Sequence, residues 1–384
     1  ECVLLTGTPR VGTTRARTVE GLPMFAAHAH CVSTRAAFGA TPCHGSTSRT
    51  HSRVLGFAKP NRRGPATKGR NAAYPSITAS ASSNDDARIT VIGEALWDSL
   101  PKGLFLGGAP ANVACHLREL GRSPTVVSRV GDDELGREVL RRLTKRGLST
   151  DLIQVDTTNT PTGFVVVTMD GSMPSYDIVQ PSAWDAMEPT EQLVTAATGA
   201  VVVYGSLAQR DARSRAAIGA AAAVASKRVF DINLRPPFID PAMCVEHAKQ
   251  CWLLKLNDDE LPEMYNWCGL DGLDGSDPAQ VIAMACAVRD ALECDNLCVT
   301  RGGDGALLVA SSGAVAQHPG FDVTAVDTVG AGDSFLATLL DSLLGGATAS
   351  ASLERACRVG AFVATQQGAT PMHDRDAIEG LVSK

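Results

Sequence analysis

The sequence has no run of 18 or more apolar residues, so a membrane-spanning helix is not expected. It also has no excess of basic residues: 35 Lys and Arg stand against 41 Asp and Glu, and a formal charge of -6 argues against nucleic acid as the main partner. None of the 11 cysteines forms a C-x-x-C pair or a Cys/His pattern of zinc type. We therefore expect free thiols in a globular protein, which 44% hydrophobic and 20% charged residues also indicate.

Acidic residues are nearly missing from the first part of this 384-residue chain. Residues 1–84 contain eleven Lys and Arg but only Glu1 and Glu20 as acids, and none occurs from Met24 to Asn84. A segment rich in Arg and Ser and poor in acids, ahead of a folded domain, is typical of an organelle transit peptide. We expect residues 1–87 to be a transit peptide or disordered, with the plastid as destination and the mitochondrion as the alternative. A basic tail that binds anionic partners is a further interpretation.

The chain opens on Glu rather than Met. Two interpretations stay open: the sequence is a fragment, or residues 1–23 lie upstream of a true start at Met24. A secretory signal is not expected, because no apolar core of 7–15 residues follows a basic stretch.

From Arg88 onward, apolar strands alternate with amphipathic helices. The pattern predicts strands over 89–93, 125–130, 201–206, 228–233, 252–257, 297–301 and 306–310, and helices over 109–120, 133–146, 211–226 and 278–292, with two more at the end. This alternation predicts one α/β domain over 88–384, a three-layer sandwich with a mostly parallel sheet between helices. A hairpin near 163–179 does not fit the alternation and indicates a small β appendage.

The stretch Asp327-Thr-Val-Gly-Ala-Gly-Asp333 follows a predicted strand over 322–326 and opens a helix. Glycines at such a turn let backbone N–H groups converge on an anion, and the helix dipole adds to the attraction. A carboxylate beside an anion site is unfavourable unless it accepts a proton there. Asp333 is therefore a candidate general base for a hydroxyl that attacks a phosphoryl group. The alternative is an Asp that caps its own helix.

Three further polar clusters occur at a predicted helix start, in a tight bend between two predicted strands and at the end of a predicted strand, in that order. Gly107-Gly-Ala-Pro-Ala-Asn112 permits close approach of a ligand to the backbone, and Asp98 offers a carboxylate for hydroxyl groups. Thr300-Arg-Gly-Gly-Asp-Gly305 could cover a nucleotide, and Asn257-Asp-Asp-Glu260, after Lys255, could order the waters of Mg²⁺. The structural alternatives are turn residues, a plain β-turn and a helix N-cap, respectively.

In this order the clusters resemble the PfkB (ribokinase-like) carbohydrate kinase family, and within it the fructokinases, over about residues 88–371. The N-terminal signature of that family is matched by Gly107, Gly108, Pro110, Asn112, Ala114, Gly121 and Gly131, and the C-terminal one by residues 327–333. The opening Gly93-Glu-Ala-Leu-Trp-Asp98 and the stretches Asp231-Ile-Asn-Leu-Arg235 and Lys255-Leu-Asn-Asp-Asp-Glu260 look like fructokinase motifs.

The resemblance implies a role for each matched position. Asp333 would be the base, with the backbone of Gly330, Ala331 and Gly332 as an anion hole. Sugar hydroxyls would be bound by Asp98, Gly107, Gly108 and Asn112. Mg²⁺ and phosphate would be organised by Asn257 and Glu260, and ATP bordered by Asn233, Lys255, Thr300, Gly302 and Gly305. A monovalent cation, usually K⁺, is a further cofactor that the family implies.

The resemblance also implies a β lid, from about 98–107 and 158–184, that closes over the sugar and pairs with a second lid in a homodimer. The expected partners are a sugar and ATP, with fructose phosphorylated to fructose 6-phosphate. Ribose, 2-keto-3-deoxygluconate or a nucleoside are alternative substrates. The alternative to an enzyme is a catalytically silent kinase-like protein that serves in an organelle complex.

Some positions depart from the family pattern. Thr338 stands where Gly or Ala is usual and could crowd the packing, and Cys357 falls near where many members place an Asn by the adenine. The stretch 176–184 lacks the Tyr-Arg pair of plant-type fructokinases, while Trp184 could stack on a sugar or simply pack. We expect His116 on the exposed side of its helix, and neither it nor His373 in the chemistry.

Overall fold

The computed structural model describes residues 87–100, 103–170 and 173–384. The predicted transit peptide, apart from its last residue, and the Met24 start lie outside the described residues. Within the described ranges, no helix combines the length and the apolar character needed to cross a membrane.

A nine-stranded sheet forms the centre of the fold, in the order β13-β12-β11-β10-β9-β8-β1-β4-β5. The strands from β5 to β11 pair in parallel, and β12 and β13 continue the sheet antiparallel. Their bounds are β1 Ile89–Ile92, β4 Thr125–Gly131, β5 Ile153–Asp156, β8 Val201–Gly205, β9 Lys227–Asp231, β10 Leu253–Asn257, β11 Asn296–Thr300, β12 Ala306–Val309 and β13 Val315–His318. The predicted mostly parallel sheet is confirmed.

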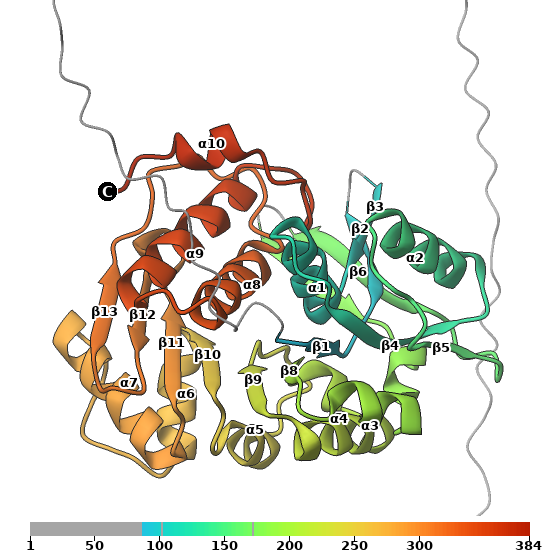
Figure 1. The fold of residues 1–384 in the computed structure, drawn as a ribbon, viewed down its shortest axis with the longest axis horizontal. Helices are drawn as coiled ribbons and strands as arrows, with labels where there is room; N and C mark the ends of the chain where they lie inside the picture. Colours follow the sequence, from blue (N-terminus) through green and yellow to red (C-terminus); the bar gives the residue numbers. More distant parts are fainter. Residues whose placement is uncertain (1–86, 101–102, 171–172) are drawn as a thin grey trace, which may run out of the picture. The chain divides into compact units, whose positions relative to one another are not determined.

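Helices cover both faces of this sheet (Figure 1). One face carries α1 Ala109–Glu119, α2 Glu134–Lys145, α8 Ala331–Leu344 and α9 Ala349–Ala364, with α10 Arg375–Glu379 beside α9. The other carries α3 Glu191–Ala197, α4 Ala212–Val224, α5 Pro241–Ala248, α6 Glu260–Trp267 and α7 Pro278–Leu292. Three short 3₁₀ turns are η1 Ala183–Ala186, η2 Leu207–Gln209 and η3 Gly302–Asp304. The predicted three-layer sandwich is confirmed.

Strand β8 explains why the sheet is covered on both sides. All five of its residues are buried. Val202 and Tyr204 belong to the core under α3–α7, whereas Val201 and Val203 belong to the core under α1, α2, α8 and α9. Because successive side chains point to opposite faces of a strand, an uninterrupted apolar run needs a helix layer on each face.

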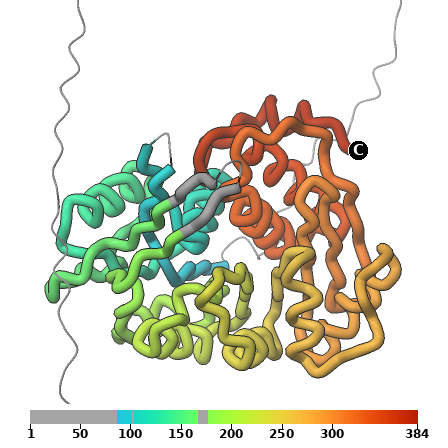
Figure 2. Tube along the Cα trace, turned by 180° about the vertical axis from the view of Figure 1, so that it is seen from behind, coloured from blue at the N-terminus to red at the C-terminus, as the bar shows by residue number. Residues whose placement is uncertain are grey.

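A second sheet of four strands lies beside the main one, in the order β3-β2-β6-β7 (Figure 2). It consists of β2 Leu96–Leu100, β3 Gly103–Gly107, β6 Gly163–Asp170 and β7 Met173–Ile178. Strand β2 pairs with β6 in parallel, and the outer pairs are antiparallel. The predicted small β appendage is therefore present.

Arg210 ties the end of β7 to the body of the protein. Its guanidinium donates to both carboxylate oxygens of Asp185, at 2.7 and 2.9 Å, and to the carbonyl of Val179 at 3.2 Å. It also stacks on the Trp184 ring, 4.0 Å from the centroid. Trp184 is fully buried, so it is a packing residue and does not offer a face to a sugar.

The predicted strand over 322–326 is wrong. Phe321 forms a single bridge with Ser383, and the following residues are irregular. The N–H groups of Val326 and Asp327 both donate to the carbonyl of Ala364, at the end of α9. The backbone of this segment hydrogen-bonds to the end of a helix and not to a neighbouring strand. An apolar pattern in the sequence does not distinguish these two cases.

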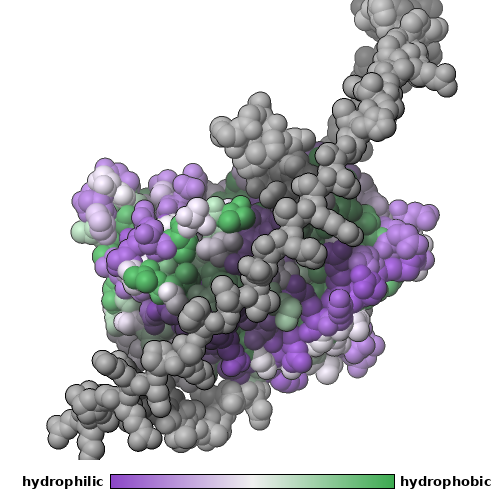
Figure 3. All heavy atoms as spheres, turned by 90° about the horizontal axis from the view of Figure 1, so that it is seen from above, coloured by the Kyte–Doolittle hydropathy of each residue, from purple (hydrophilic) through white to green (hydrophobic). Residues whose placement is uncertain are grey.

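Exposed apolar side chains are scattered over the described surface. On the face seen in Figure 3, hydrophobic residues occur in small groups among hydrophilic ones. The large hydrophobic residues that are exposed come from separate elements: Leu104, Val155, Ile239, Val315, Val326, Met372 and Val382. Single exposed apolar residues of this kind are ordinary and mark no docking surface.

The turn between β11 and β12 depends on a glycine. Gly305 has φ +79°, and a Cβ there would overlap the carbonyl oxygen of His318. Gly313, in the next turn, has the same φ but open space around it. We expect Gly313→Ala to lower the free energy of unfolding by about 1 kcal/mol from backbone strain alone, and Gly305→Ala by about 2–5 kcal/mol because overlap is added. Denaturant unfolding of both variants measures the difference, and equal losses would show that the overlap relaxes.

Candidate active site

The N-termini of α1 and α8 meet at the candidate site, although they are far apart in the sequence. Asn112, in the first turn of α1, donates from Nδ2 to Oδ2 of Asp333, in the first turn of α8, at 2.8 Å. Both side chains are buried. Asn112 Oδ1 has no hydrogen-bond partner among the described residues. The two strongest sequence motifs are thus in direct contact, and they leave one buried acceptor free.

The glycine turn before Asp333 is held from two directions. Asp327 accepts from the N–H of Val329 at 3.0 Å and from that of Gly368 at 3.0 Å, through different oxygens. Gly330, with φ +80°, lies so close to the backbone of Ala369 that a Cβ would overlap it. A glycine is therefore required at 330, and residues 368–369 pack directly against the turn.

The start of α8 offers unpaired backbone donors. The first intrahelical bond runs from the N–H of Ser334 to the carbonyl of Gly330. The N–H groups of Gly332 and Asp333 have no acceptor among the described residues, and no side chain caps the helix. Since a helix N-terminus carries partial positive charge, these donors suit an anion.

Burial changes the acidity of Asp333. Removal from water raises its pKa to about 6, and Asp231 adds to this effect, while the Asn112 hydrogen bond, Lys255 and Arg235 oppose it. A carboxyl group with a pKa near the operating pH can accept a proton and release it again. The side chain is therefore suited to general-base chemistry, and no hydrogen bond from a backbone N–H to its carboxylate makes it a helix cap.

Asp98 comes from β2 of the small sheet. Burial raises its pKa to about 6, with a further rise from Asp333 and an opposing effect of Arg235. A Cβ at Gly107 would overlap the Asp98 carboxylate, because β2 and β3 pair side by side there. Gly108 has φ +99° and packs against the carbonyl of Glu94. Both glycines thus bring β1, β2 and the start of α1 together, and Asp98 interacts electrostatically with Asp333.

Glu94 is a site residue that the sequence prediction missed. It lies two residues after the end of β1 and is buried, with Oε1 accepting from the N–H of Ala109 at 3.3 Å and Oε2 without a partner among the described residues. Burial raises its pKa to about 7, and the nearby Asp333 contributes. The available signal was a charged residue directly after the predicted apolar strand over 89–93.

Asn257 and Glu260 form a reciprocal pair at the end of β10. The Glu260 N–H donates to Asn257 Oδ1, and the Asn257 N–H donates to Glu260 Oε2, both at 2.8 Å. Glu260 Oε1 accepts from the N–H of Leu234 at 2.7 Å. No cluster of three His, Cys, Asp or Glu suited to a metal occurs in the described ranges. Both carboxylate oxygens of Glu260 and Oδ1 of Asn257 thus accept backbone N–H groups and fix the turn between β10 and α6.

Two more predicted residues come from neighbouring strands of the main sheet. Lys255 is the register partner of Asp231 and donates to both of its carboxylate oxygens, at 2.9 and 3.0 Å. Asn233, two residues after β9, has φ +40°, a left-handed conformation that Asn tolerates. Asn233 thus lies beyond the C-terminal end of β9, and Lys255 lies two residues before that of β10, near the edge where an α/β sheet binds its ligands.

The predicted nucleotide turn follows β11. Thr300 is the register partner of Asn257, and its Oγ1 donates to the carbonyl of Leu256 at 3.3 Å. Gly302, with φ +50°, begins the 3₁₀ turn that Gly305 ends. This turn lies one strand away from the Asn257–Glu260 pair.

The two departures from the family pattern are accommodated in the core. Thr338 is fully buried, and its Oγ1 donates to the carbonyl of Ser334 at 2.8 Å. Cys357 is a buried member of the core under α8 and α9, and burial raises the pKa of its thiol to about 12.

The prediction that His116 is exposed is wrong. The ring is fully buried, with Nε2 2.9 Å from the carbonyl oxygen of Ala369 and Nδ1 3.0 Å from Nε2 of His373. Because a carbonyl only accepts, His116 Nε2 carries the proton and Nδ1 accepts from His373. Burial lowers the pKa of His116 to about 3, so the ring is neutral. His116 lies one turn after Asn112 and supports Ala369, the residue behind Gly330.

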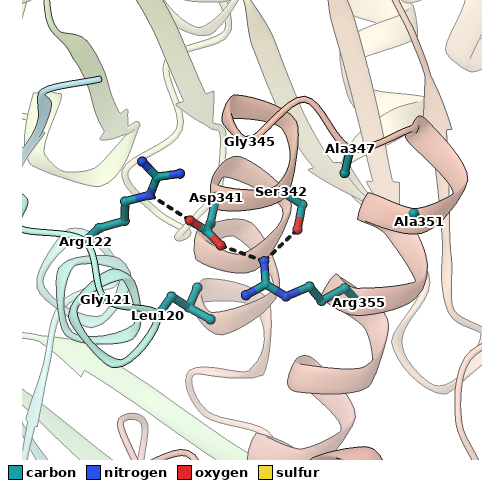
Figure 4. A pocket seen from close by; sticks show the side chains of 9 residues that line it. All are labelled: Leu120, Gly121, Arg122, Asp341, Ser342, Gly345, Ala347, Ala351 and Arg355. Atoms are coloured by element: carbon teal, nitrogen blue, oxygen red, sulfur yellow. Dashed lines mark hydrogen bonds and ion pairs between the residues drawn. The ribbon is translucent and has the colours of Figure 1, made fainter. Parts of the chain in front are cut away.

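A cavity of about 670 Å³ lies at the opposite ends of α1 and α8 (Figure 4). Arg122 and Arg355 both bind Asp341, at 2.7 and 2.6 Å, and Arg355 also donates to Ser342 at 3.0 Å. These ion pairs connect α8 to α9 and to the residues just after α1. Cations near the C-terminal end of a helix are also stabilising. The cavity is separate from the contact between Asn112 and Asp333.

The raised pKa of Glu94 predicts a pH-dependent stability difference. Its folded pKa, about 7, lies above the ordinary glutamate value of 4.5, so the folded state binds the proton more tightly than the unfolded state. Stability is therefore lost as the pH rises from about 4.5 through 7, by up to about 3 kcal/mol. Glu94→Gln should be more stable than the wild type at pH 8 and lose this advantage at pH 5. The exposed Asp304→Asn is the control, and a pH-independent difference for Glu94→Gln would contradict the assignment.

Comparisons with known proteins agree with this geometry. The family model of pfkB family carbohydrate kinases matches residues 103–375. The chain is similar to probable fructokinase-5 of Arabidopsis thaliana, with 30% identity over 317 residues that cover 74% of this chain and 93% of the relative.

Two solved structures share the fold. One is the fructokinase of Xylella fastidiosa with bound ATP, at TM-score 0.63 and 23% identity, covering 74% of this chain and 94% of that one. The other is a double mutant of the Vibrio cholerae fructokinase with fructose, ADP and potassium ion bound, at TM-score 0.62 and 24% identity, covering 76% and 97%. The family match spans most of the chain and contains both glycine motifs, and the chain belongs to the pfkB family of carbohydrate kinases.

Proposed function

We propose that this chain is an ATP-dependent kinase for a sugar hydroxyl, with fructose, phosphorylated to fructose 6-phosphate, as the favoured substrate. The observation that carries the proposal is the buried contact of Asn112 with Asp333 at the N-terminus of α8. It combines a carboxyl group of pKa about 6 with the free N–H groups of Gly332 and Asp333. A base and an anion site within one helical turn are what phosphoryl transfer to an alcohol requires.

The sugar would bind where buried acceptors lack partners. Asn112 Oδ1 and Glu94 Oε2 are orphaned acceptors, and Asp98 adds a carboxylate from the small sheet. Sugar hydroxyl groups are donors of matching chemistry, and burying an acceptor without a donor costs about 1–3 kcal/mol. Gly107 and Gly108 allow the ligand to approach the backbone there.

The reaction then follows from the positions of the groups. Asp333 accepts the proton of the attacking hydroxyl while the sugar oxygen forms a bond to the γ-phosphorus. The bond from that phosphorus to the ADP oxygen breaks. The backbone of Gly330, Ala331 and Gly332 stabilises the negative charge of the transferring group. Removal of water by the small sheet would strengthen each of these interactions.

Two cations belong to the proposal. Mg²⁺ would neutralise the phosphates of ATP, with Asn257 and Glu260 ordering its water, and Asn233, Thr300, Gly302 and Gly305 would border the nucleotide. A monovalent cation, K⁺, would lie beside the anion hole near Asp327, which carries a carboxylate already fixed by Val329 and Gly368. Equal turnover in K⁺ and tetramethylammonium would remove K⁺ from the proposal.

We further propose a kinase domain over 88–384, in which the strands of 98–107 and 158–184 close over the sugar as a lid. Pairing of two lids would give a homodimer, which sedimentation tests. A plastid address for the segment before residue 88 remains a proposal, with the mitochondrion as the alternative. A reporter fused to residues 24–87 tests it, and retention in the cytosol would contradict both.

The substrate is tested with the full chain, ATP and Mg²⁺. Fructose, ribose, 2-keto-3-deoxygluconate and nucleosides are compared by kcat/KM. We expect fructose to be preferred. A different preferred substrate would correct only the sugar, whereas absence of turnover with the whole panel would favour the catalytically silent alternative.

Asp333→Asn tests the base. The amide is nearly isosteric, so the fold and the affinity for ATP should persist, while kcat should fall roughly 10²–10⁴-fold. The control is Asp277→Asn at the N-cap of α7, where the side chain accepts two backbone N–H bonds, and this variant should keep its turnover. If Asp333 were only a cap, its variant would lose about 1 kcal/mol of stability and retain activity. Measuring kcat and Tm on one preparation separates the two outcomes.

A further inference from the structure

A buried ion pair lies beside the glycine turn of α8. Lys255 and Asp231 face each other across β10 and β9, and each is 5% exposed. Among the ion-paired Lys and Arg side chains of the described residues, only that of Arg210, 5% exposed, is as buried as that of Lys255, which is 6% exposed. Two of its three N–H groups bind Asp231, and the third has no acceptor among the described residues.

Stability alone does not account for such a pair. Taking two charges out of water costs several kcal/mol for each ion, and replacing a buried pair by apolar residues is often neutral or stabilising. An ammonium group with an unused donor is a further cost, because a buried donor without a partner loses its hydrogen bond to water. A ligand that accepts this donor would offset that cost.

The position of the ammonium identifies such a ligand. A Cβ built on Gly332 would lie 3.7 Å from Lys255 Nζ, with no other neighbour within 4 Å. The ammonium group is therefore next to the turn whose N–H groups are free for an anion. Besides Asp231, the carboxyl groups of Glu260 and Asp333 lie near enough to attract the ammonium group.

These carboxyl groups keep Lys255 charged. Burial by itself lowers its pKa, but the attraction of Asp231, Glu260 and Asp333 outweighs burial and holds the pKa above its ordinary value. A phosphoryl group brings further negative charge to this place, and a fixed cation in a site without water stabilises it more than a mobile cation in water would.

We propose that Lys255 is a catalytic residue that binds the transferring phosphoryl group through its third N–H. Asp231 is the positioning residue that orients the Lys255 ammonium group. The inference rests on the proposed kinase function and deepens it. Lys255 keeps its proton throughout: the hydroxyl proton goes to Asp333, and the phosphorus exchanges its bond to ADP for a bond to the sugar oxygen. Lys255 supplies charge and one hydrogen bond.

The test compares the wild type with three variants of the full chain. Lys255→Met leaves the Asp231 charge buried without a partner, so a lowered Tm is expected and its activity alone decides nothing. The double variant Lys255→Met/Asp231→Asn removes both charges at nearly constant volume. Lys255→Arg keeps the charge and should retain more turnover than the double variant.

We expect the double variant to recover most of the Tm lost in Lys255→Met, while its kcat stays roughly 10²–10³-fold below the wild type. The KM for the sugar should change little, because Lys255 faces the phosphoryl group. A pair with a purely structural role would recover Tm and kcat together. The matched control is Arg129→Met/Asp156→Asn, which removes an ion pair of 3.0 Å between β4 and β5 and should leave kcat within about threefold of the wild type.

The outcomes separate the two proposals. If the wild type phosphorylates a sugar and the double variant does so at the same rate, only the role of Lys255 fails. If the wild type phosphorylates no sugar in the panel, the proposed function fails and this inference fails with it. A folded double variant with selectively reduced kcat supports both.

Discussion

The hydrogen bond from Asn112 to Asp333 links two helix N-termini across 221 residues of sequence. It brings the sugar end of the proposed site, at α1, to the phosphoryl end, at α8. Two glycines near this bond allow backbone segments to approach each other closely. Gly108 packs against the backbone of Glu94, and Gly330 packs against that of Ala369. Packing of both helices on one face of the parallel sheet keeps this contact at the carboxyl edge of the strands, where ligands of such folds bind.

Burial is the physical property that makes the contact chemically useful. It raises the pKa of Asp333 and Asp98 to about 6 and that of Glu94 to about 7. Three carboxyl groups in one poorly hydrated region cannot all be charged at low cost, so each holds its proton to a higher pH than an exposed carboxyl group would. In the proposed reaction this region gains a phosphate as well, and Lys255 with the N-terminus of α8 provides the balancing positive charge.

Much of the fold and part of the site could be predicted from the sequence. The alternation of apolar strands such as 201–206 with helices predicted a mostly parallel sheet, because period and length are local properties of a sequence. The glycine motifs identified Asn112 and Asp333 as candidate site residues, because each motif lies within a short stretch of sequence. Their contact could not be derived from spacing, since it depends on how α1 and α8 pack.

The errors came from tertiary packing. Residues 322–326 have the apolar character of a strand, yet their backbone bonds to the end of α9. His116 was predicted to be exposed because helical periodicity does not show that the segment at 369–373 covers it. Glu94 was missed because its raised pKa comes from burial, which a sequence does not display. Trp184 was left open between packing and sugar binding, and the Arg210 guanidinium over its ring decides for packing.

The central claim is that a buried Asp333 accepts the hydroxyl proton. The pH dependence of kcat/KM for the sugar in the wild-type enzyme tests it most directly, because it reports ionisation in the free enzyme. We predict that the rate falls tenfold per pH unit below an apparent pKa of about 6. A rate that stays constant down to pH 4.5 in a protein that remains folded would contradict the account.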